Sequence, residues 1–392
     1  MRYIGSKKLL LGDIERVIDE NIKDAGTFCD IFSGTVCVGD YFKKRYKIIT
    51  NDLLYFSYCI QRTVIENNTV PKFEKLGFNP IPYFNNLYAD ELEKLLQSRR
   101  FCVNNFSPSG GRMYLSEKNA LKIDFVRNTI EDWRAEGLIN EAEYYYLIAV
   151  LIEAIPFVSN ISGTYGAYNK FWDKRSLKDL VLKNIEIFDN KKENKAFNLD
   201  GNELIKKISG DILYIDPPYN KRQYSSNYHL LETVAKYDNP SLKGVTGLRE
   251  NETKSDYCKK NIVLKSFEDL VKNAKFKHII MSYSTEGLMG VNDIETVLRK
   301  YGTDYKLYEI DYRRFKSRGK SKQVGGLKEL IFYIKKNFSP SPLVGESSGA
   351  EGIHSIGSPR PLWESRQERK AYIQSVPLAP CGRGVRGEGF IK

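Results

Sequence analysis

The chain has 392 residues, and its 61 Lys and Arg residues outnumber its 49 Asp and Glu residues, which gives a formal net charge of +12 at pH 7. This basic balance favours a polyanionic partner, because cations that neutralise phosphates release condensed counterions. The six cysteines form no C-x-x-C pair, there are three histidines, and no apolar run is long enough to span a membrane. We therefore expect a cytoplasmic protein without a signal peptide, a membrane anchor, a disulfide framework or a metal.

The first 64 residues carry segments that are typical of a cofactor site. A glycine-containing loop at 33–39 separates an expected strand over 27–32 from an expected helix that starts near residue 40. This order forms a mononucleotide-type site, in which Gly34 permits close approach of the backbone. Asp30 and Phe32 would flank the loop, as an acceptor for an ammonium group and as an apolar wall. The spacing of a Walker loop is absent, which argues against nucleoside triphosphates.

The next expected strand, over 46–50, leads to an acidic residue, Asp52. An acidic residue at the end of the second strand can accept hydrogen bonds from both hydroxyls of a ribose. The alternative is that Asp52 caps a helix that starts at Leu53. Its spacing from the first loop favours ribose binding.

Strand patterns lapse between residues 65 and 195, where helices are predicted over 89–97, 117–135 and 140–154. Basic residues in this stretch could meet phosphates, or could lie on solvated helix faces: Arg99, Arg100, Arg112, Lys118, Lys122 and Arg127. The stretch 159–172 differs, because glycine, small polar and aromatic residues alternate there and lead into Lys174 and Arg175. This composition suits a loop that reaches a DNA groove and stacks on an unpaired or flipped base, with a plain surface loop as the alternative.

Residues 211–219 form the stretch around which the rest of the chain is organised. An apolar run predicts a buried strand, and its rigid tip is Asp216-Pro217-Pro218-Tyr219. The Asp216 carboxylate and the Pro217 carbonyl could accept two N–H bonds from an exocyclic amino group, which would localise its lone pair toward an incoming methyl group. Tyr219 could then stack on the base once it has left the duplex. Alternatively, the aspartate and tyrosine are incidental to a Pro-Pro turn.

Beyond this stretch, a strand is predicted over 277–283, and a closing antiparallel pair over 305–312 and 329–335. The tip of that pair is strongly basic, and it predicts a phosphate clamp formed by Arg313, Arg314, Lys316 and Arg318. His229 and Glu232 lack a third ligand nearby, so we interpret them as one helix face and not as metal ligands. Residues 339–392 are rich in Pro and Gly without a sustained period, which predicts a disordered tail.

Asp-Pro-Pro-Tyr after such a strand resembles the motif of DNA adenine-N6 methyltransferases of the D12 class. The stretch that follows, with Asn-Tyr-His-Leu-Leu-Glu-Thr at 227–233, resembles the restriction–modification branch of that family. The resemblance covers residues 1–336 and implies a Rossmann-like α/β fold. Its sheet would be mostly parallel with an antiparallel C-terminal hairpin, and a mainly helical target-recognition region would be inserted into it.

The resemblance also implies roles for individual residues. S-adenosylmethionine would be the cofactor, held in part by Tyr3 and Lys7, which occupy an aromatic-x-Gly-x-Lys segment. Asp200, at a neighbouring strand end, could meet the adenine edge of the cofactor, or could cap a helix. The family usually has glycine where this chain has Val36, a departure that bears on how closely the backbone can approach the cofactor.

We therefore expect a site-specific methyltransferase that acts on N6 of a flipped adenine in double-stranded DNA, with a cognate restriction endonuclease as a possible separate partner. The alternatives are N4-cytosine methylation and a catalytically silent, sequence-specific DNA-binding module. The expected organisation comprises a cofactor-binding half (1–64), the inserted helical region (65–195), the Asp-Pro-Pro-Tyr half (196–338) and the tail (339–392).

Overall fold

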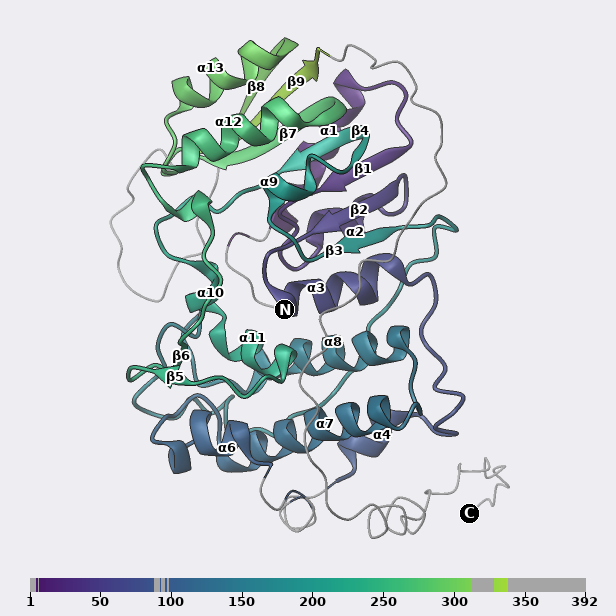
Figure 1. Cartoon of the computed structure of the whole chain (residues 1–392), viewed down its shortest axis with the longest axis vertical. Coiled ribbons are helices and arrows are strands. Elements are labelled where there is room, and N and C mark those ends of the chain that lie inside the picture. Colours follow the sequence, from purple (N-terminus) through teal and green to yellow (C-terminus); the bar gives the residue numbers. More distant parts are fainter. Residues whose placement is uncertain are drawn as a thin grey trace, which may run out of the picture. The chain divides into compact units, whose positions relative to one another are not determined.

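The computed structural model contains a seven-stranded sheet (Figure 1). The model describes residue 5 and residues 7–87, 92, 96, 99–311 and 328–337, all of which belong to one compact unit. The strand order is β3-β2-β1-β4-β7-β9-β8. The strands are β1 (Thr27–Asp30), β2 (Lys47–Asn51), β3 (Lys195–Phe197), β4 (Ser209–Ile215), β7 (Lys275–Ser284), β8 (Gly302–Asp311) and β9 (Lys328–Lys336).

The sheet is mostly parallel, as the sequence predicted. Strands β3, β2, β1, β4 and β7 are parallel to one another, whereas β9 is antiparallel to both β7 and β8. β4 lies between β1 and β7, and its last four residues are fully buried. Such a continuous apolar run is typical of a parallel strand that is covered on both faces.

The two faces of the sheet have separate cores. Ile212 and Tyr214 of β4 point into one core, and Leu213 and Ile215 point into the other, because successive side chains alternate along a strand. The first core contains the apolar residues of α1 (Leu11–Asn21), α2 (Cys37–Phe42) and α3 (Tyr55–Gln61). The second contains those of α12 (Val263–Asn273) and α13 (Val291–Tyr301).

The region between β2 and β3 is helical, as predicted. It contains a π-helix (Arg62–Glu66), α4 (Pro80–Asn85), α6 (Phe101–Phe106), a 3-10 turn (Pro108–Gly110), α7 (Glu117–Ala135) and α8 (Glu141–Val158). Figure 1 shows α7 and α8 side by side. α8 also contacts α3, so the core of this region continues the first core of the sheet.

Local signals account for the ends of these two helices. Asn140 and Glu143 form a reciprocal capping box at the start of α8. The helix continues through Pro156 and ends at Val158, four residues beyond the predicted end at 154. The helix predicted over 89–97 lies outside the described residues, except for positions 92 and 96.

Two basic residues of this region donate hydrogen bonds to backbone carbonyls, and their contact with phosphates stays a prediction. Arg127 is 2 % exposed, and its guanidinium donates to the carbonyls of Val234 and Ala235. Arg112 donates to the carbonyls of Gly244 and Val245, which belong to the turn between β5 (Leu242–Lys243) and β6 (Leu248–Arg249). Both guanidinium groups therefore join the helical region to the segment that follows Asp-Pro-Pro-Tyr.

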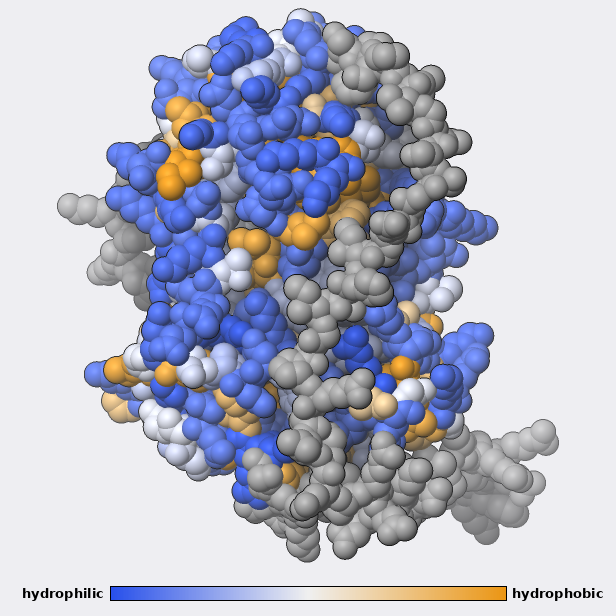
Figure 2. All heavy atoms as spheres, viewed as in Figure 1, coloured by the Kyte–Doolittle hydropathy of each residue, from blue (hydrophilic) through white to orange (hydrophobic). Residues whose placement is uncertain are grey.

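The remaining described helices are short: α9 (Gly201–Leu204), α10 (Tyr224–Asn227), α11 (His229–Lys236) and 3-10 turns over Lys7–Leu9 and Asp256–Cys258. Within the described part of the chain, no helix combines the length and apolar character that crossing a membrane requires. On the face shown in Figure 2, hydrophilic residues predominate and hydrophobic residues form smaller, separate areas. The domain boundaries at 64/65 and 195/196 stay a prediction, and the predicted tail lies outside the described residues.

Candidate active site

A cavity opens at the carboxyl ends of β1, β2 and β4, where the strand order reverses on either side of β1. Open α/β sheets bind ligands at this switch point. The empty space, counted out to the solvent, is about 970 Å³. The cavity brings together the predicted site residues Lys7, Asp30, Phe32, Gly34, Asp52, Asp200, Asp216, Pro217, Pro218 and Tyr219.

The Asp-Pro-Pro-Tyr tip forms one wall of this cavity. Asp216 follows the last residue of β4, and its Oδ1 lies 3.2 Å from Nζ of Lys7. Burial raises the pKa of Asp216 to about 6, although the positive charge of Lys7 works in the opposite direction. The same Nζ lies 5.5 Å from the centre of the Tyr219 ring, so the cation contacts both ends of the motif.

Lys7 lies between two carboxylates. Its side chain is 4 % exposed, and its Nζ donates to Oε2 of Glu329 on β9 at 3.3 Å. Burial by itself lowers the pKa of Lys7, but Asp216 and Glu329 outweigh it and leave the pKa above its ordinary value. Lys7 is therefore a cation that holds Asp216 in place, and its predicted contact with a cofactor carboxylate stays a prediction.

Asp30, at the end of β1, has an incompletely satisfied carboxyl group. It is 2 % exposed, and its Oδ1 has no hydrogen-bond partner. Burial raises the pKa of Asp30 well above its usual value, and the charges of Asp216 and Asp52 raise it further. A cation that entered the cavity would relieve this unfavourable environment.

Asp52 accepts hydrogen bonds from the glycine loop and from the start of α3. Its Oδ2 accepts a bond of 2.9 Å from the backbone N–H of Gly34, and its Oδ1 accepts one of 2.8 Å from Leu54 at the start of α3. Burial raises the pKa of Asp52 to about 6. The carboxylate therefore fixes the glycine loop against α3, and each oxygen keeps acceptor capacity. Ribose binding stays a prediction.

Asp200 and Phe32 form another part of the wall. Asp200 caps α9, since its carboxylate accepts from the backbone N–H of Asn202 at 2.9 Å. This is the alternative role considered for it, and its contact with an adenine edge stays a prediction. The Phe32 ring packs edge-on against Tyr257, with centroids 4.8 Å apart. Tyr257 lines the same cavity, so two aromatic rings form an apolar surface there.

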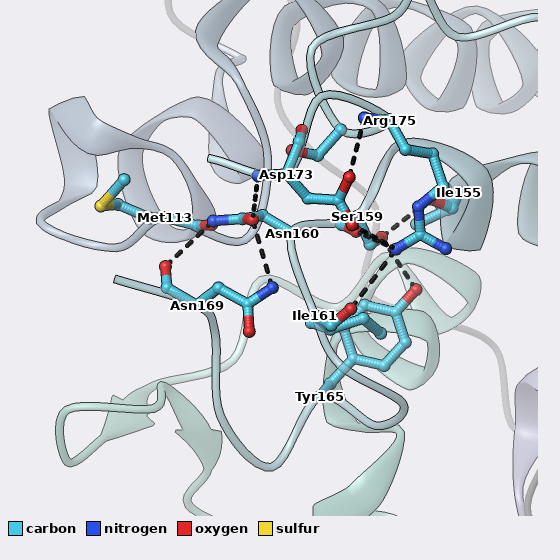
Figure 3. Close-up of polar contacts among 10 residues, drawn as sticks. Met113, Ile155, Ser159, Asn160, Ile161, Tyr165, Asn169, Asp173 and Arg175 are labelled. Atoms are coloured by element: carbon cyan, nitrogen blue, oxygen red, sulfur yellow. Dashed lines mark hydrogen bonds and ion pairs between the residues drawn. The ribbon is translucent and has the colours of Figure 1, made fainter. Parts of the chain in front are cut away.

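The residues predicted to bind DNA are only partly described. Lys174 is exposed, whereas Arg175 is 29 % exposed and donates to the carbonyls of Ser159 and Ile161 at 3.0 and 3.3 Å (Figure 3). These bonds give Arg175 a structural role, and its contact with phosphate stays a prediction. Outside the described residues lie Tyr3, Arg313, Arg314, Lys316 and Arg318.

Two acidic residues, Glu329 and Glu232, make contacts that the sequence patterns did not indicate. Glu329 pairs with Lys7 across 322 positions of sequence, and no local pattern could have indicated it. Glu232 of α11 accepts bonds from the backbone N–H groups of Tyr55 and Phe56 at 3.1 and 3.0 Å, and so fixes the start of α3. Among the described residues, no group of three His, Cys, Asp or Glu side chains could hold a metal ion.

The fold and this cavity define a methyltransferase class. Residues 3–297 match the D12 class of N6 adenine-specific DNA methyltransferases, and the chain belongs to that family. The family and the Rossmann-like fold predicted from the sequence are therefore confirmed. Neither the N4-cytosine alternative nor the silent binding module is favoured by this match.

Individual relatives agree with the family. The chain is 48% identical over 393 residues to the type II methyltransferase M.FokI of Planomicrobium okeanokoites, covering 97% of this chain and 60% of the relative. It is 46% identical over 344 residues to the modification methylase StsI of Streptococcus sanguinis, covering 86% and 52%. It is 38% identical over 352 residues to the type II methyltransferase M.NlaIII of Neisseria lactamica, covering 86% and 100%. The chain thus spans 52% to 60% of the length of the first two relatives and the whole of the third.

Proposed function

We propose that the protein transfers a methyl group from S-adenosylmethionine to N6 of an adenine that has been flipped out of duplex DNA. The observation that carries this proposal is the position of Asp216, directly after β4, paired with Lys7 and facing the cavity at 17 % side-chain exposure. An ionised carboxylate there accepts hydrogen bonds and donates none. It therefore suits an amino group whose lone pair must be localised on the nitrogen before the nitrogen can accept a methyl group.

Each residue of the Asp-Pro-Pro-Tyr tip that contacts the base has a separate role in activating the target amino group. The Asp216 carboxylate and the Pro217 carbonyl accept the two N–H bonds of the target amino group, which directs its lone pair away from the ring. Tyr219 stacks on the flipped base and replaces the neighbours that it had in the duplex. As the nitrogen gains a methyl group it loses one proton, which leaves along the hydrogen bond to Asp216 or to solvent.

The charges of the cavity fit the proposed cofactor. Asp30, Asp52 and Asp216 line the cavity, and the pKa of each is raised by burial. A ligand that carries an ammonium and a sulfonium group relieves this excess of negative charge. The orphaned Oδ1 of Asp30 suits the ammonium group, Asp52 suits ribose hydroxyls, and Phe32 with Tyr257 suits an adenine ring. When bound, the sulfonium supplies a methyl group that is already activated.

The biological role that we propose is cytoplasmic modification of chromosomal DNA within a restriction–modification system. Two relatives are named type II methyltransferases and another is named a modification methylase. A cognate restriction endonuclease, acting as a separate protein, would recognise the same site.

Single-molecule sequencing of DNA from cells with and without the gene tests this function. We expect N6-methyladenine at one defined sequence with the wild-type gene, and none with a gene that encodes Asp216→Ala. N4-methylcytosine at a defined sequence would instead establish the alternative target. Sequence-specific binding by the purified protein without any methylated base would establish the silent module.

A further inference from the structure

A second cavity lies beside the Asp-Pro-Pro-Tyr tip. Tyr219 lines both cavities, and the second is completed by Thr164, Lys221, Arg222, Asn227 and Glu286, among others. Its empty space, counted out to the solvent, is about 910 Å³. A base that stacks on Tyr219 carries its sugar and phosphate with it, so a neighbouring cavity must accommodate them.

Thr164 of the loop 159–175 lines this second cavity, and the loop is held by its own polar contacts (Figure 3). The Asn160 side chain donates to the carbonyls of Met113 and Asn169 at 3.0 Å each and accepts from the backbone N–H of Asp173 at 3.1 Å. With the Arg175 bonds described above, these contacts close the loop at its base. The loop is therefore a fixed wall.

The backbone of Tyr165 joins this loop to the segment that follows Tyr219. Its N–H donates to the carbonyl of Asn227 at 2.8 Å. Its carbonyl accepts from the Tyr114 hydroxyl at 2.7 Å and lies 2.9 Å from Nε2 of His229, which must donate because a carbonyl can only accept. Part of the Asn-Tyr-His stretch that follows the motif thus serves to hold the loop.

The next residue, Gly166, lies directly against Arg222. A Cβ atom at Gly166 would lie 1.7 Å from Nη2 and 2.7 Å from Cζ of Arg222. The guanidinium of Arg222 therefore packs directly against the backbone of Gly166, where any residue with a Cβ atom would clash with it. This contact fixes the guanidinium at the second cavity without using its hydrogen-bond donors on an acid.

Two cations of this cavity are available for an anion. Among the residues that the structure describes, Lys221 and Arg222 form no ion pair, and both are exposed. Glu286 contributes one carboxylate to the same lining, so the three side chains carry a net charge of +1. A guanidinium presents paired N–H donors that match phosphate oxygens, and lysine adds a point charge.

We propose that Lys221 and Arg222 bind the phosphodiester of the flipped nucleotide while its base stacks on Tyr219, and that Gly166 is required to position Arg222. This inference rests on the proposed function, and it assigns the phosphodiester of the flipped nucleotide to the second cavity. Arg222 acts on the DNA substrate and not on the cofactor.

The test compares Arg222→Ala, Arg222→Lys and Gly166→Ala with wild type on a duplex that carries the sequence mapped by the sequencing experiment. For Arg222→Ala we expect KM for DNA to rise about 10-fold, as for loss of one charge-assisted hydrogen-bonded contact. The salt dependence of binding should become shallower by about 0.9 log units per lost contact. Arg222→Lys should recover part of both effects, and Gly166→Ala should resemble Arg222→Ala with an unchanged melting temperature.

Lys265→Ala is the matched control, since it removes one exposed cation from α12 and lines neither cavity. Equal losses in Lys265→Ala and Arg222→Ala would show a general charge effect and overturn the inference. So would wild-type KM and salt slope in Arg222→Ala, or a weakened affinity of that variant for S-adenosylmethionine. Failure of the wild-type protein to methylate any DNA would instead contradict the proposed function.

Discussion

The two ends of β4 carry aspartates in opposite environments. At the amino end, Asp211 accepts three bonds at one oxygen, from Gly26 N at 2.9 Å and from Thr27 N and Oγ1 at 3.0 Å each, while its other oxygen pairs with Lys277 at 2.7 Å. Burial would raise the pKa of Asp211, but these donors outweigh it and lower the pKa to about 2. At the carboxyl end, burial raises the pKa of Asp216 to about 6 even beside Lys7.

The ionised carboxylate of Asp211 stabilises the fold, whereas the ionised carboxylate of Asp216 destabilises it. The hydrogen bonds and the ion pair of Asp211 outweigh the effect of its burial, whereas burial raises the pKa of Asp30, Asp52 and Asp216, which line one cavity. Perturbed groups of this kind cluster at functional sites. The sheet therefore places the aspartate with the lowered pKa near the start of β4, and the aspartates with raised pKa values around the cavity at the carboxyl ends of the strands.

Among the variants, removing the charge of Asp216 should reduce the rate of methyl transfer most. Asp216→Asn keeps the shape of the side chain but presents an amide to the target amino group, and we expect at least about a 100-fold loss of kcat. The melting temperature should not fall, because the charge is unfavourable there and Lys7 keeps Glu329. Initial rates with radiolabelled S-adenosylmethionine and a thermal scan check both parts. Near wild-type turnover would show that Asp216 is not part of the chemistry.

Asp52→Ala tests the cofactor side of the same cavity. Loss of a charge-assisted hydrogen bond costs about 1.5–3 kcal/mol, so calorimetry should show Kd for S-adenosylmethionine raised about 10-fold or more. Asp52→Asn keeps one acceptor oxygen, which can serve Gly34 or Leu54 but not both, and should show a smaller change than Asp52→Ala. Asp13→Ala, at an exposed ion pair on α1, is the control that should bind normally. Unchanged affinity in Asp52→Ala would leave Asp52 with its capping role alone.

The raised pKa of Asp216 also predicts a pH profile. The carboxyl group accepts hydrogen bonds fully only when ionised, so the rate at saturating cofactor should fall as the pH drops through about 6. Below that value we expect about a tenfold decrease per pH unit for one required ionisation. Saturation with cofactor separates this effect from Asp52, whose pKa is also about 6. A rate that stays constant from pH 8 to pH 5 would contradict the assignment.

Patterned segments of the fold could be predicted from the sequence. The strand before Asp-Pro-Pro-Tyr and the helix over 117–135 were predicted because apolar runs and helical periods are local signals. β3 has three residues, Lys195–Phe197, with no apolar alternation, and is defined only by its pairing with β2. The two-residue strands β5 and β6 were missed for the same reason.

Residues that line the cavity could be predicted where they lie at or directly after a strand end, as for Asp30, Asp52 and Asp216. A contact was not predictable where the partner lies far along the chain, as for Lys7 with Glu329. The backbone conformation at Val36 is a third feature, and the side-chain type did not indicate it. The φ of Val36 is +59° in the left-handed region, although a β-branched residue there costs on the order of 1–2 kcal/mol. The loop thus has, at Val36, a backbone conformation that favours glycine.

The smallest predicted effect is a change in the free energy of unfolding on substitution of Asp211, at the other end of β4. Asp211→Asn should lower the free energy of unfolding by about 1–2 kcal/mol without changing kcat, since it weakens bonds at the amino end only. The pKa of Asp211 lies below its unfolded value, so its stabilisation is fully present above pH ~4 and is lost as the pH falls through about 2. Urea unfolding should therefore give the same deficit for Asp211→Asn at pH 5 and at pH 7.

Asp216→Asn should behave in the opposite way in the same experiment. The pKa of Asp216 lies above its unfolded value, so wild type loses stability as the pH rises through about 6, and the variant does not. Asp216→Asn should thus gain stability relative to wild type between pH 5 and pH 7. If both variants show the same pH dependence, the two ends of β4 do not differ electrostatically, and the raised pKa at the carboxyl end cannot be the mark of the active site.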